Sequence, residues 1–208
     1  PDALDIYGTD KPDTRYGFTL HDVSQLAARS SYEFFRTIVE EGGVVKGIRL
    51  PGCARYSRKE IDDLAAFAAG FGGQGLSYVK VVEGGLSSPI SKFFEPQLFE
   101  KLLRELEAAK GDLLILIAGQ RRKVNAPLGA IRTKVADDEG VIPKGQLSFL
   151  WVVDFPLFSY NEEEQRLDSE HHPFTSPAEE DIALLVTDPL KVRSASYDLV
   201  LNGVEVGS

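Results

Sequence analysis

Two adjacent histidines, His171 and His172, are the residues whose type points most directly to chemistry in this chain. Beside Pro173 and after an acidic stretch, two imidazoles could donate to a carboxylate, coordinate a metal or titrate near neutral pH. Neighbouring side chains of an extended segment point in opposite directions, so both reach one site only if the backbone bends there. The alternative is a surface or capping pair. Zinc is disfavoured because His21 is the only further histidine and Cys53 the only cysteine.

Two carboxylates, Asp198 and Glu205, stand on either side of the run LVLNG. Two carboxylates completed by water and phosphate oxygens form the kind of ligand set that Mg²⁺ prefers. Because 205 minus 198 is seven, an odd number, a regular strand would send the two side chains to opposite faces. A bend at Asn202-Gly203 is therefore needed to bring them together. The alternative is a pair of solvated acids at the ends of strands.

A third acid and a basic cluster are also candidates. Asp154 interrupts an apolar run, and a buried carboxylate must be paired or hydrogen-bonded, so we expect a structural partner for it. Arg121, Arg122 and Lys123 form the densest basic cluster, which would either contact RNA phosphates or form a solvated helix end. The serines and glycines match neither a nucleophile elbow nor a phosphate-binding loop, so nucleophilic catalysis has no support.

Regular elements must position these residues. Ser57 and Glu60 have the spacing of a capping box and predict a helix that ends at Gly72-Gly73. A second helix is expected over 97–110, and a third over 121–137, which should start near Asn125 or kink there because of Pro127. Short apolar runs at 44–50, 76–82 and 113–118 predict strands.

The two ends of the chain have a different character. Residues 1–15 mix Pro, Gly and Asp with charge and predict a turn-rich connector. The run 149–158 predicts a buried strand, and 160–166 an exposed acidic turn. Ser176-Pro177 has the N-cap and first-turn signals of a helix that continues to Leu185. A last strand is expected over 197–201.

The composition limits the class of protein. The 208 residues are 43% apolar and 26% charged, which is enough to bury a core. A net charge of -9 argues against one broad basic face for nucleic acid but leaves local patches open. No run approaches the roughly 20 apolar residues of a membrane span, so we expect a soluble, cytoplasmic protein. The absence of methionine and the start at Pro1 predict a piece of a larger parent.

Four sequence segments, taken in order, closely resemble bacterial aspartyl-tRNA synthetases. They are YGTDKPDTR at 7–15, FLWVVDFPLF at 149–158, HHPFTSP at 171–177 and YDLVLNGVEVG at 197–207. The resemblance implies an α+β fold. Residues 1–15 would be a connector of the catalytic domain, 16–147 the bacterial GAD-type insertion domain with a mixed or antiparallel sheet, and 148–208 part of a class II antiparallel-sheet catalytic domain.

The resemblance also implies roles for residues. His171 corresponds to the family's contact to the aspartate substrate, with His172 beside it in the pocket. Glu205 corresponds to the glutamate that binds ATP through Mg²⁺, and Asp198 to its partner metal ligand. In the parent, the aspartate carboxylate would attack the α-phosphorus of ATP, and the 3′ end of tRNA would then accept the aspartyl group. His171 would bind and orient the substrate, so no residue is assigned as catalytic.

The family's dimer motif, anticodon-binding domain, ATP-gripping arginine motif and later glycine-rich and ATP-binding motifs are all outside this sequence. We therefore expect a homodimeric parent and an inactive isolated chain. Thr9 replaces the family's usual serine, and Ser208 its usual glycine. Two other functions remain open: an isolated insertion domain that binds tRNA or protein without catalysis, and a Mg²⁺-dependent hydrolase that uses His171, Asp198 and Glu205.

Overall fold

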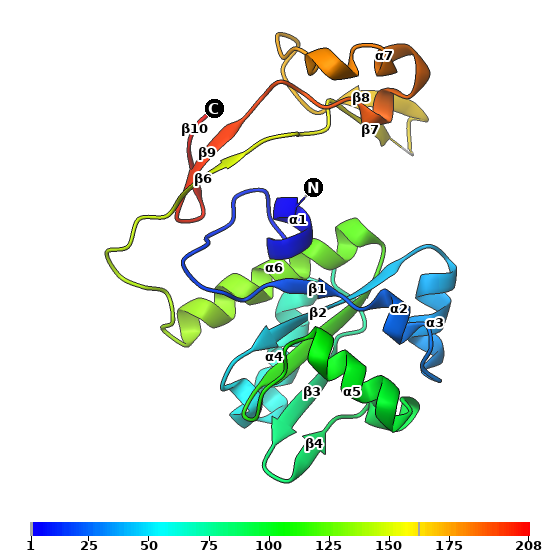
Figure 1. Cartoon of the computed structure of the whole chain (residues 1–208), viewed down its shortest axis with the longest axis vertical. Helices are drawn as coiled ribbons and strands as arrows, with labels where there is room; N and C mark the ends of the chain where they lie inside the picture. Colours follow the sequence, from blue (N-terminus) through cyan, green and yellow to red (C-terminus); the bar gives the residue numbers. More distant parts are fainter. Residues whose placement is uncertain (1, 162) are drawn as a thin grey trace. The chain divides into compact units, whose positions relative to one another are not determined.

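The computed structural model describes residues 2–161 and 163–208, which form two compact units (Figure 1). The larger unit comprises Asp2–Asp10 and Tyr16–Lys144, and the smaller comprises Lys11–Arg15 and Gly145–Ser208. The segment 1–15 is therefore not one connector. Its first part is helix α1 (Asp2–Tyr7), where the sequence analysis expected turns.

A five-stranded antiparallel sheet forms the centre of the larger unit. Its strand order is β1-β2-β5-β3-β4, so neighbours in the sheet are mostly distant in sequence. The predicted runs form the three central strands. The bounds are β1 Leu20–Asp22, β2 Val44–Leu50, β3 Ser77–Val82, β4 Gly85–Ser87 and β5 Leu113–Gly119.

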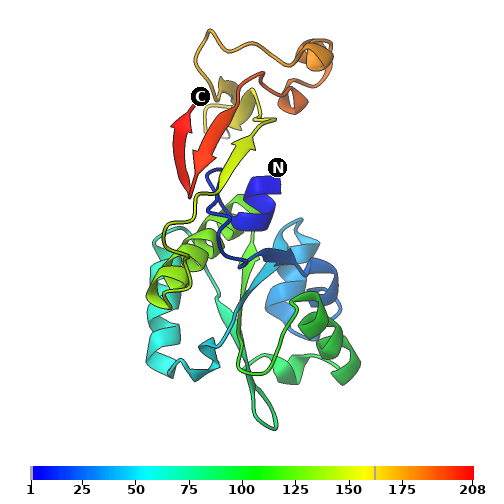
Figure 2. The ribbon, with the colours of Figure 1, turned by 60° about the vertical axis from the view of Figure 1, so that its left-hand side comes forward.

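Helices cover both faces of this sheet (Figure 2). One core cluster joins the sheet to α4 (Arg58–Ala69) and α6 (Arg121–Asp138). The other joins it to α2 (Ser24–Ala27), α3 (Glu33–Glu40) and α5 (Pro96–Glu105). In β5, Leu113, Ile115 and Ile117 face the first cluster, whereas Leu114, Leu116 and Ala118 face the second. The continuous apolar run of β5 thus follows from burial on both faces.

The helix predictions are confirmed at some boundaries and wrong at others. Ser57 caps α4 through the complete capping box with Glu60, as predicted. Helix α5 ends at Glu105 and not at Lys110. Helix α6 begins at Arg121, so the first of the two expected alternatives, a start near Asn125, is wrong.

Pro127 lies inside α6 because tertiary packing offsets its missing hydrogen bond. Its ring fits against Gly73, where an added Cβ would lie 2.8 Å from the Cβ of Pro127. Val124, Leu128, Ile131 and Val135 of the same helix are fully buried. These contacts outweigh a helix-breaking preference that local sequence alone reports.

Helix α1 packs on α6 through a contact that only glycine permits. Gly8 follows α1 with a φ of +75°, and a Cβ there would lie 2.4 Å from the carbonyl oxygen of Asn125. Beside it, the buried Arg132 guanidinium lies between the rings of Tyr7 and Tyr16, 5.0 and 4.1 Å from their centroids. Arg132 also donates to the carbonyls of Tyr16 and Phe18. Helix α1 and the chain from Tyr16 to Phe18 are thus fixed to α6.

The smaller unit is built from short strands. One antiparallel sheet has the order β10-β9-β6, and β7 pairs with β8 in a hairpin. The bounds are β6 Phe149–Val152, β7 Phe158–Asn161, β8 Arg166–Ser169, β9 Asp198–Leu201 and β10 Val204–Gly207. The α+β class predicted from the sequence is confirmed.

Two of three local predictions are wrong in this unit. The run 149–158 is not one buried strand: β6 ends at Val152, and Phe149 and Trp151 are exposed. The expected exposed acidic turn is confirmed, because residues 163–165 form an exposed turn between β7 and β8. The helix predicted from Ser176 is shorter and later, a 3₁₀ turn over Glu179–Asp181 followed by α7 (Leu184–Thr187). Pro177 instead makes a β-bridge with Ser194.

Candidate functional site

The two predicted metal ligands share one face of the β9–β10 hairpin. Asn202 and Gly203, with φ of +52° and +83°, form its two-residue turn. Such a turn matches the twist of antiparallel strands when both central residues have positive φ. Glu205 pairs directly with Val200, and Asp198 lies two residues earlier on the same strand as Val200. The turn therefore supplies the bend that the odd spacing required.

Asn202 fixes the hairpin turn to the chain that leads into β6. Its side-chain oxygen accepts from the backbone N–H of Ser148 at 2.9 Å, and its amide nitrogen donates to the carbonyl of Gln146 at 3.0 Å. Asparagine also tolerates the left-handed backbone of this position. The same residue thus sets both the turn and its anchorage.

The acidic pair is partly accessible to solvent. Glu205 and Asp198 are half-buried, and Glu205 forms an ion pair with Lys11 at 2.7 Å. Across residues 2–161 and 163–208, no three His, Cys, Asp or Glu side chains are grouped to hold a metal ion. A cation bound here would take two protein carboxylates and complete its shell from water or phosphate oxygens, as Mg²⁺ commonly does.

The two predicted histidines have separate surroundings. His171 is half-buried, and its Nε2 lies 3.1 Å from the carbonyl oxygen of Pro156 and 3.3 Å from Oγ of Ser194. Its ring meets that of Phe155 edge to face, with centroids 5.8 Å apart. This contact set orients the imidazole.

A pair of hydroxyl groups continues from His171 toward β9. Ser194 Oγ is 2.6 Å from Oγ of Ser196, which stands two residues before Asp198. His172, in contrast, is exposed, and its ring lies 4.9 Å from the ring of Phe174. His171 is therefore the better-positioned member of the pair for orienting a small polar ligand.

Asp154 is not the buried acid that the sequence suggested. Its φ is +60°, and half of its side chain is exposed. It does have the expected structural partner, because Arg193 Nη1 lies 3.1 Å from its Oδ1. The left-handed backbone after β6 turns the carboxylate out of the apolar row.

Arg193, which was not predicted as a site residue from the sequence, organises the surroundings of His171. Its guanidinium and backbone N–H donate to Asp181 at 2.7 and 2.9 Å, and it also reaches Glu180. These hydrogen bonds lower the pKa of Asp181. Pro156 pairs with Arg193 in a β-bridge, and Ser194 is its neighbour. Arg193 thus holds together both hydrogen-bond partners of His171. Its position between Val192 and Ser194 gave no local signal of this role.

The basic cluster at the start of α6 is divided between two roles. Arg121 pairs with Asp5 at 2.8 Å and reaches Asp22 at 3.7 Å. Arg122 and Lys123 are exposed. Arg121 therefore contributes to the architecture of the larger unit, and the two residues after it are the ones that could meet a partner.

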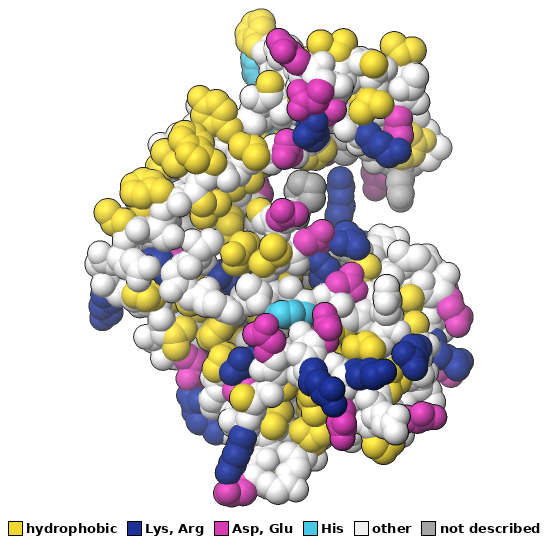
Figure 3. Space-filling model, in the orientation of Figure 1, with side chains coloured by type: hydrophobic (Ala, Val, Ile, Leu, Met, Phe, Trp, Pro, Cys, Tyr) yellow, Lys and Arg dark blue, Asp and Glu magenta, His cyan; other side chains and the backbone are white. Residues whose placement is uncertain are grey.

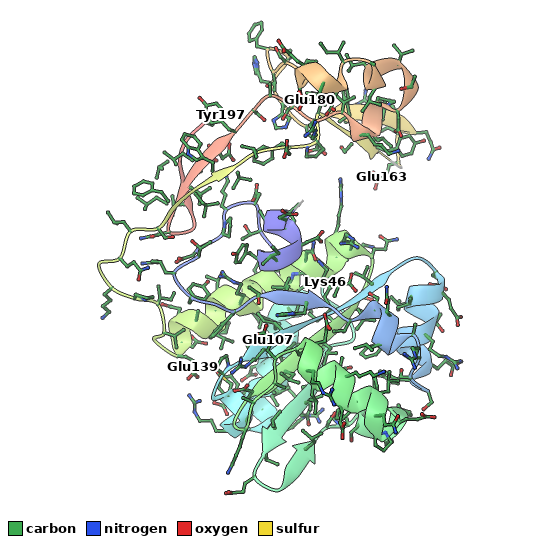
Figure 4. All side chains as sticks on the ribbon, in the orientation of Figure 1. Lys46, Glu107, Glu139, Glu163, Glu180 and Tyr197 are labelled. Atoms are coloured by element: carbon green, nitrogen blue, oxygen red, sulfur yellow. The ribbon has the colours of Figure 1, made fainter. Side chains whose placement is uncertain are left out.

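Asp5, a residue of α1, is the centre of a charge network that links this helix to β2 and α6. It accepts from the buried Lys46 of β2 at 2.7 Å, as well as from Arg121 at 2.8 Å. Figure 4 labels Lys46 in the larger unit. Although burial raises the pKa of Asp5, the hydrogen bonds from these two cations and the charge of Lys46 lower it to about 2. Within residues 2–161 and 163–208, the buried Lys46 ammonium thus pairs with a carboxylate of α1.

The other face of the β6–β9–β10 sheet is apolar and exposed (Figure 3). Phe149, Trp151 and Val204 keep 57%, 60% and 62% of their surface in solvent. Phe149 and Val204 both pair with Leu201, so they lie on one face. An apolar surface of this kind is typical of a sheet that is covered by further protein.

Comparisons with known proteins agree with the sequence motifs. Residues 35–128 match the family model of the GAD domain. Over 99% of its length, the chain is 46% identical to the aspartate–tRNA(Asp/Asn) ligase of Protochlamydia amoebophila (strain UWE25), of which it covers 34%. It is 47% identical to the aspartate–tRNA(Asp/Asn) ligase of Geobacillus sp. (strain WCH70) and 46% identical to the aspartate–tRNA ligase of Bacillus licheniformis, covering 99% of this chain and 35% of each relative.

These matches confirm the resemblance to aspartate–tRNA ligases, and the chain spans about a third of the length of the curated relatives it matches. In the described chain, without residues 1 and 162, no helix is long and apolar enough to cross a membrane.

Proposed function

We propose that this chain, which matches aspartate–tRNA ligases over 99% of its length, supplies part of the active site of such a ligase. The whole protein would join aspartate to the 3′ end of a tRNA at the expense of ATP, as a cytoplasmic homodimer with a class II catalytic domain. The larger unit corresponds to the insertion domain, and the smaller unit to an edge of the catalytic domain.

His171 would bind and orient the substrate aspartate, with His172 beside it. The hydrogen bonds of the His171 ring to a carbonyl and a hydroxyl support this role, because an imidazole with fixed orientation can present a defined polar edge to a carboxylate. Asp198 and Glu205 would hold Mg²⁺ and, through it, ATP. Bound there, the cation would neutralise phosphate charge. The protein side chains in this proposal position groups and do not transfer protons.

The observation that carries the proposal is the shared face of Asp198 and Glu205. On a regular strand, two acids seven residues apart would point to opposite faces. The turn at Asn202-Gly203 and the register of β9 and β10 instead place both acids on one face. Two solvated acids at strand ends, the alternative interpretation, would not need a common face.

A chimera tests the proposal in a complete enzyme. The matching span of the Bacillus licheniformis ligase is replaced by this chain, and aspartate-dependent exchange of pyrophosphate into ATP is measured. We expect activity in the chimera, a loss of at least about 100-fold with Glu205→Gln, and a clear loss with His171→Ala. His21→Ala, in the larger unit, is the matched control and should be neutral. Full activity of the Glu205→Gln chimera would contradict the assignment.

The 208-residue chain alone should show no aspartate-dependent exchange, because the ATP-gripping arginine motif and the later glycine-rich motif of the family are absent from its sequence. Measurable exchange by the chain alone would overturn this expectation.

A binding role without catalysis is the second candidate. It is supported by Arg122 and Lys123, which are exposed at the start of an 18-residue helix whose first turn has no acidic residue. In this case the chain would bind tRNA at low salt, and Arg122→Glu with Lys123→Glu would weaken binding and reduce its salt dependence. Arg121 is excluded from the test because its change would disturb the ion pair with Asp5.

A further inference from the structure

The segment Lys11–Arg15 belongs to the smaller unit, although the chain on both sides of it belongs to the larger one. Oγ1 of Thr14 lies 2.7 Å from Oγ of Ser148. Asp13 packs against the hairpin turn so closely that a Cβ on Gly203 would be 3.3 Å from its Cβ. This segment, far from β9 and β10 in sequence, is thus fixed beside their turn.

Lys11 uses this placement to neutralise Glu205. Its Nζ lies 2.7 Å from Oε2 of Glu205, and the two side chains keep 40% and 33% of their surface exposed. Pro12 is buried and restricts the backbone of the residue before it, so Lys11 starts from a defined position. Asp198 shares the face of Glu205, and a cation on this face relieves the repulsion between two carboxylates.

We propose that Lys11 is a positioning residue for the metal site: it occupies Glu205 before the metal binds and is displaced from Oε2 when Mg²⁺ arrives. This inference rests on the proposed function of Glu205. An ammonium ion and a metal ion compete for the same carboxylate charge, so Lys11 keeps the acid ordered and lowers its affinity for a bare cation. The segment Lys11–Arg15 is thereby coupled to the binding of Mg²⁺ at the β9–β10 hairpin.

Metal affinity of the 208-residue chain tests the proposal without any measurement of activity. Mn²⁺ is titrated while the relaxation of water protons is followed. Lys11→Gln should tighten Mn²⁺ binding by about twofold to fivefold, the value of a half-exposed ion pair. Lys191→Gln removes the same charge from another paired lysine of the smaller unit and is the matched control. Glu205→Gln and Asp198→Asn should each abolish binding.

A second measurement follows Lys11 directly. Its side-chain amine and Cε resonances, assigned by loss in Lys11→Gln, should move toward those of a free lysine when Mg²⁺ is added. If metal binds through Glu205 but Lys11→Gln leaves affinity unchanged or weakens it, or if the Lys11 resonances do not move, the inference about Lys11 is wrong and the metal site stands. If the unmodified chain binds no Mn²⁺, or binding is indifferent to Glu205→Gln and Asp198→Asn, the proposed metal site itself is wrong and the inference falls with it.

Discussion

The two units of this chain bury their sheets in different ways. In the larger unit, helices cover both faces of a five-stranded sheet, and alternate residues of β5 enter two separate cores. In the described part of the smaller unit, a three-stranded sheet buries Val152 and Val200 on one face and exposes Phe149 and Trp151 on the other. Only the larger unit has the burial expected of an independently stable domain.

The more completely buried sheet and the residues proposed to bind ligands therefore lie in different units. The residues proposed to bind aspartate and Mg²⁺ lie in the smaller unit, on short strands and the loops between them. Its exposed apolar face agrees with a chain that spans about a third of its relatives, because a sheet with such a face needs a covering layer. The larger unit buries both faces of its sheet, whereas the smaller unit leaves one apolar face of its sheet exposed.

The largest effect should follow removal of a core leucine from each unit. Leu116→Ala in β5 should lower the free energy of unfolding of the larger unit by about 4 kcal/mol, because both packed faces resist collapse around the cavity. Leu157→Ala in the smaller unit should cost about 2 kcal/mol, since its less complete core can relax. Urea unfolding measures both: circular dichroism follows the helices, and fluorescence follows Trp151, the only tryptophan, in the smaller unit.

Each substitution should shift only one of these two transitions. If each substitution lowered the free energy of unfolding by the same amount in circular dichroism and in fluorescence, the two units would unfold together. The distinction between them would then be removed.

The next effect concerns the charge network that holds α1 to the larger unit. Asp5→Asn should destabilise this unit by about 2 to 3 kcal/mol, because it leaves the buried Lys46 without a carboxylate. The loss stays below that of a fully buried pair, since Asp5 is partly exposed and Lys46 still donates to its carbonyl oxygen. Asp22→Asn, an exposed partner of Arg121, is the control and should change stability by about 0.5 kcal/mol or less. Similar costs for both would refute the network.

The same carboxylate predicts a smaller, pH-dependent effect. The pKa of Asp5 falls from an ordinary 3.8 to about 2 in the folded chain, so the unfolded state binds its proton first as the pH falls. The stabilisation is complete above about pH 5 and is lost as the pH falls toward 2. After allowance for partial exposure, it amounts to about 1 kcal/mol. The free energy of unfolding, measured at several pH values for the unmodified chain and for Asp5→Asn, isolates this contribution. An equal dependence on pH in both proteins would contradict it.

Much of the larger unit could be predicted from sequence because its signals are local. The apolar run of β2 and the capping box of Ser57 depend on neighbours a few residues away. The start of α6 could not be predicted, because Pro127 is accommodated by packing against Gly73. Helix α1 was missed for the same reason: its support comes from Lys46 and Arg121, which are distant in sequence.

The candidate site shows the same limit. The bend at Asn202-Gly203 was predictable from the turn residues, and the register then places Glu205 on the face of Asp198. The ion pair of Glu205 with Lys11 crosses most of the chain, and no local pattern reports it. Arg193 was missed because its acidic partners are identified only once the loops around His171 are folded.

The smallest effect on stability, and the one that most sharpens the comparison, concerns the exposed face of the smaller sheet. Phe149→Thr with Val204→Thr keeps strand-forming residues and removes two side chains that are more than half exposed. The free energy of unfolding of the smaller unit should change by about 0.5 kcal/mol or less per site. Binding of a hydrophobic dye should nevertheless fall clearly, because the face is a continuous apolar surface. Phe71→Thr removes a half-exposed aromatic of the larger unit, whose ring contacts that of Phe67, and should leave dye binding unchanged. A large loss of stability in the double variant would mean that this face is already packed, and the smaller unit would then be as self-sufficient as the larger one.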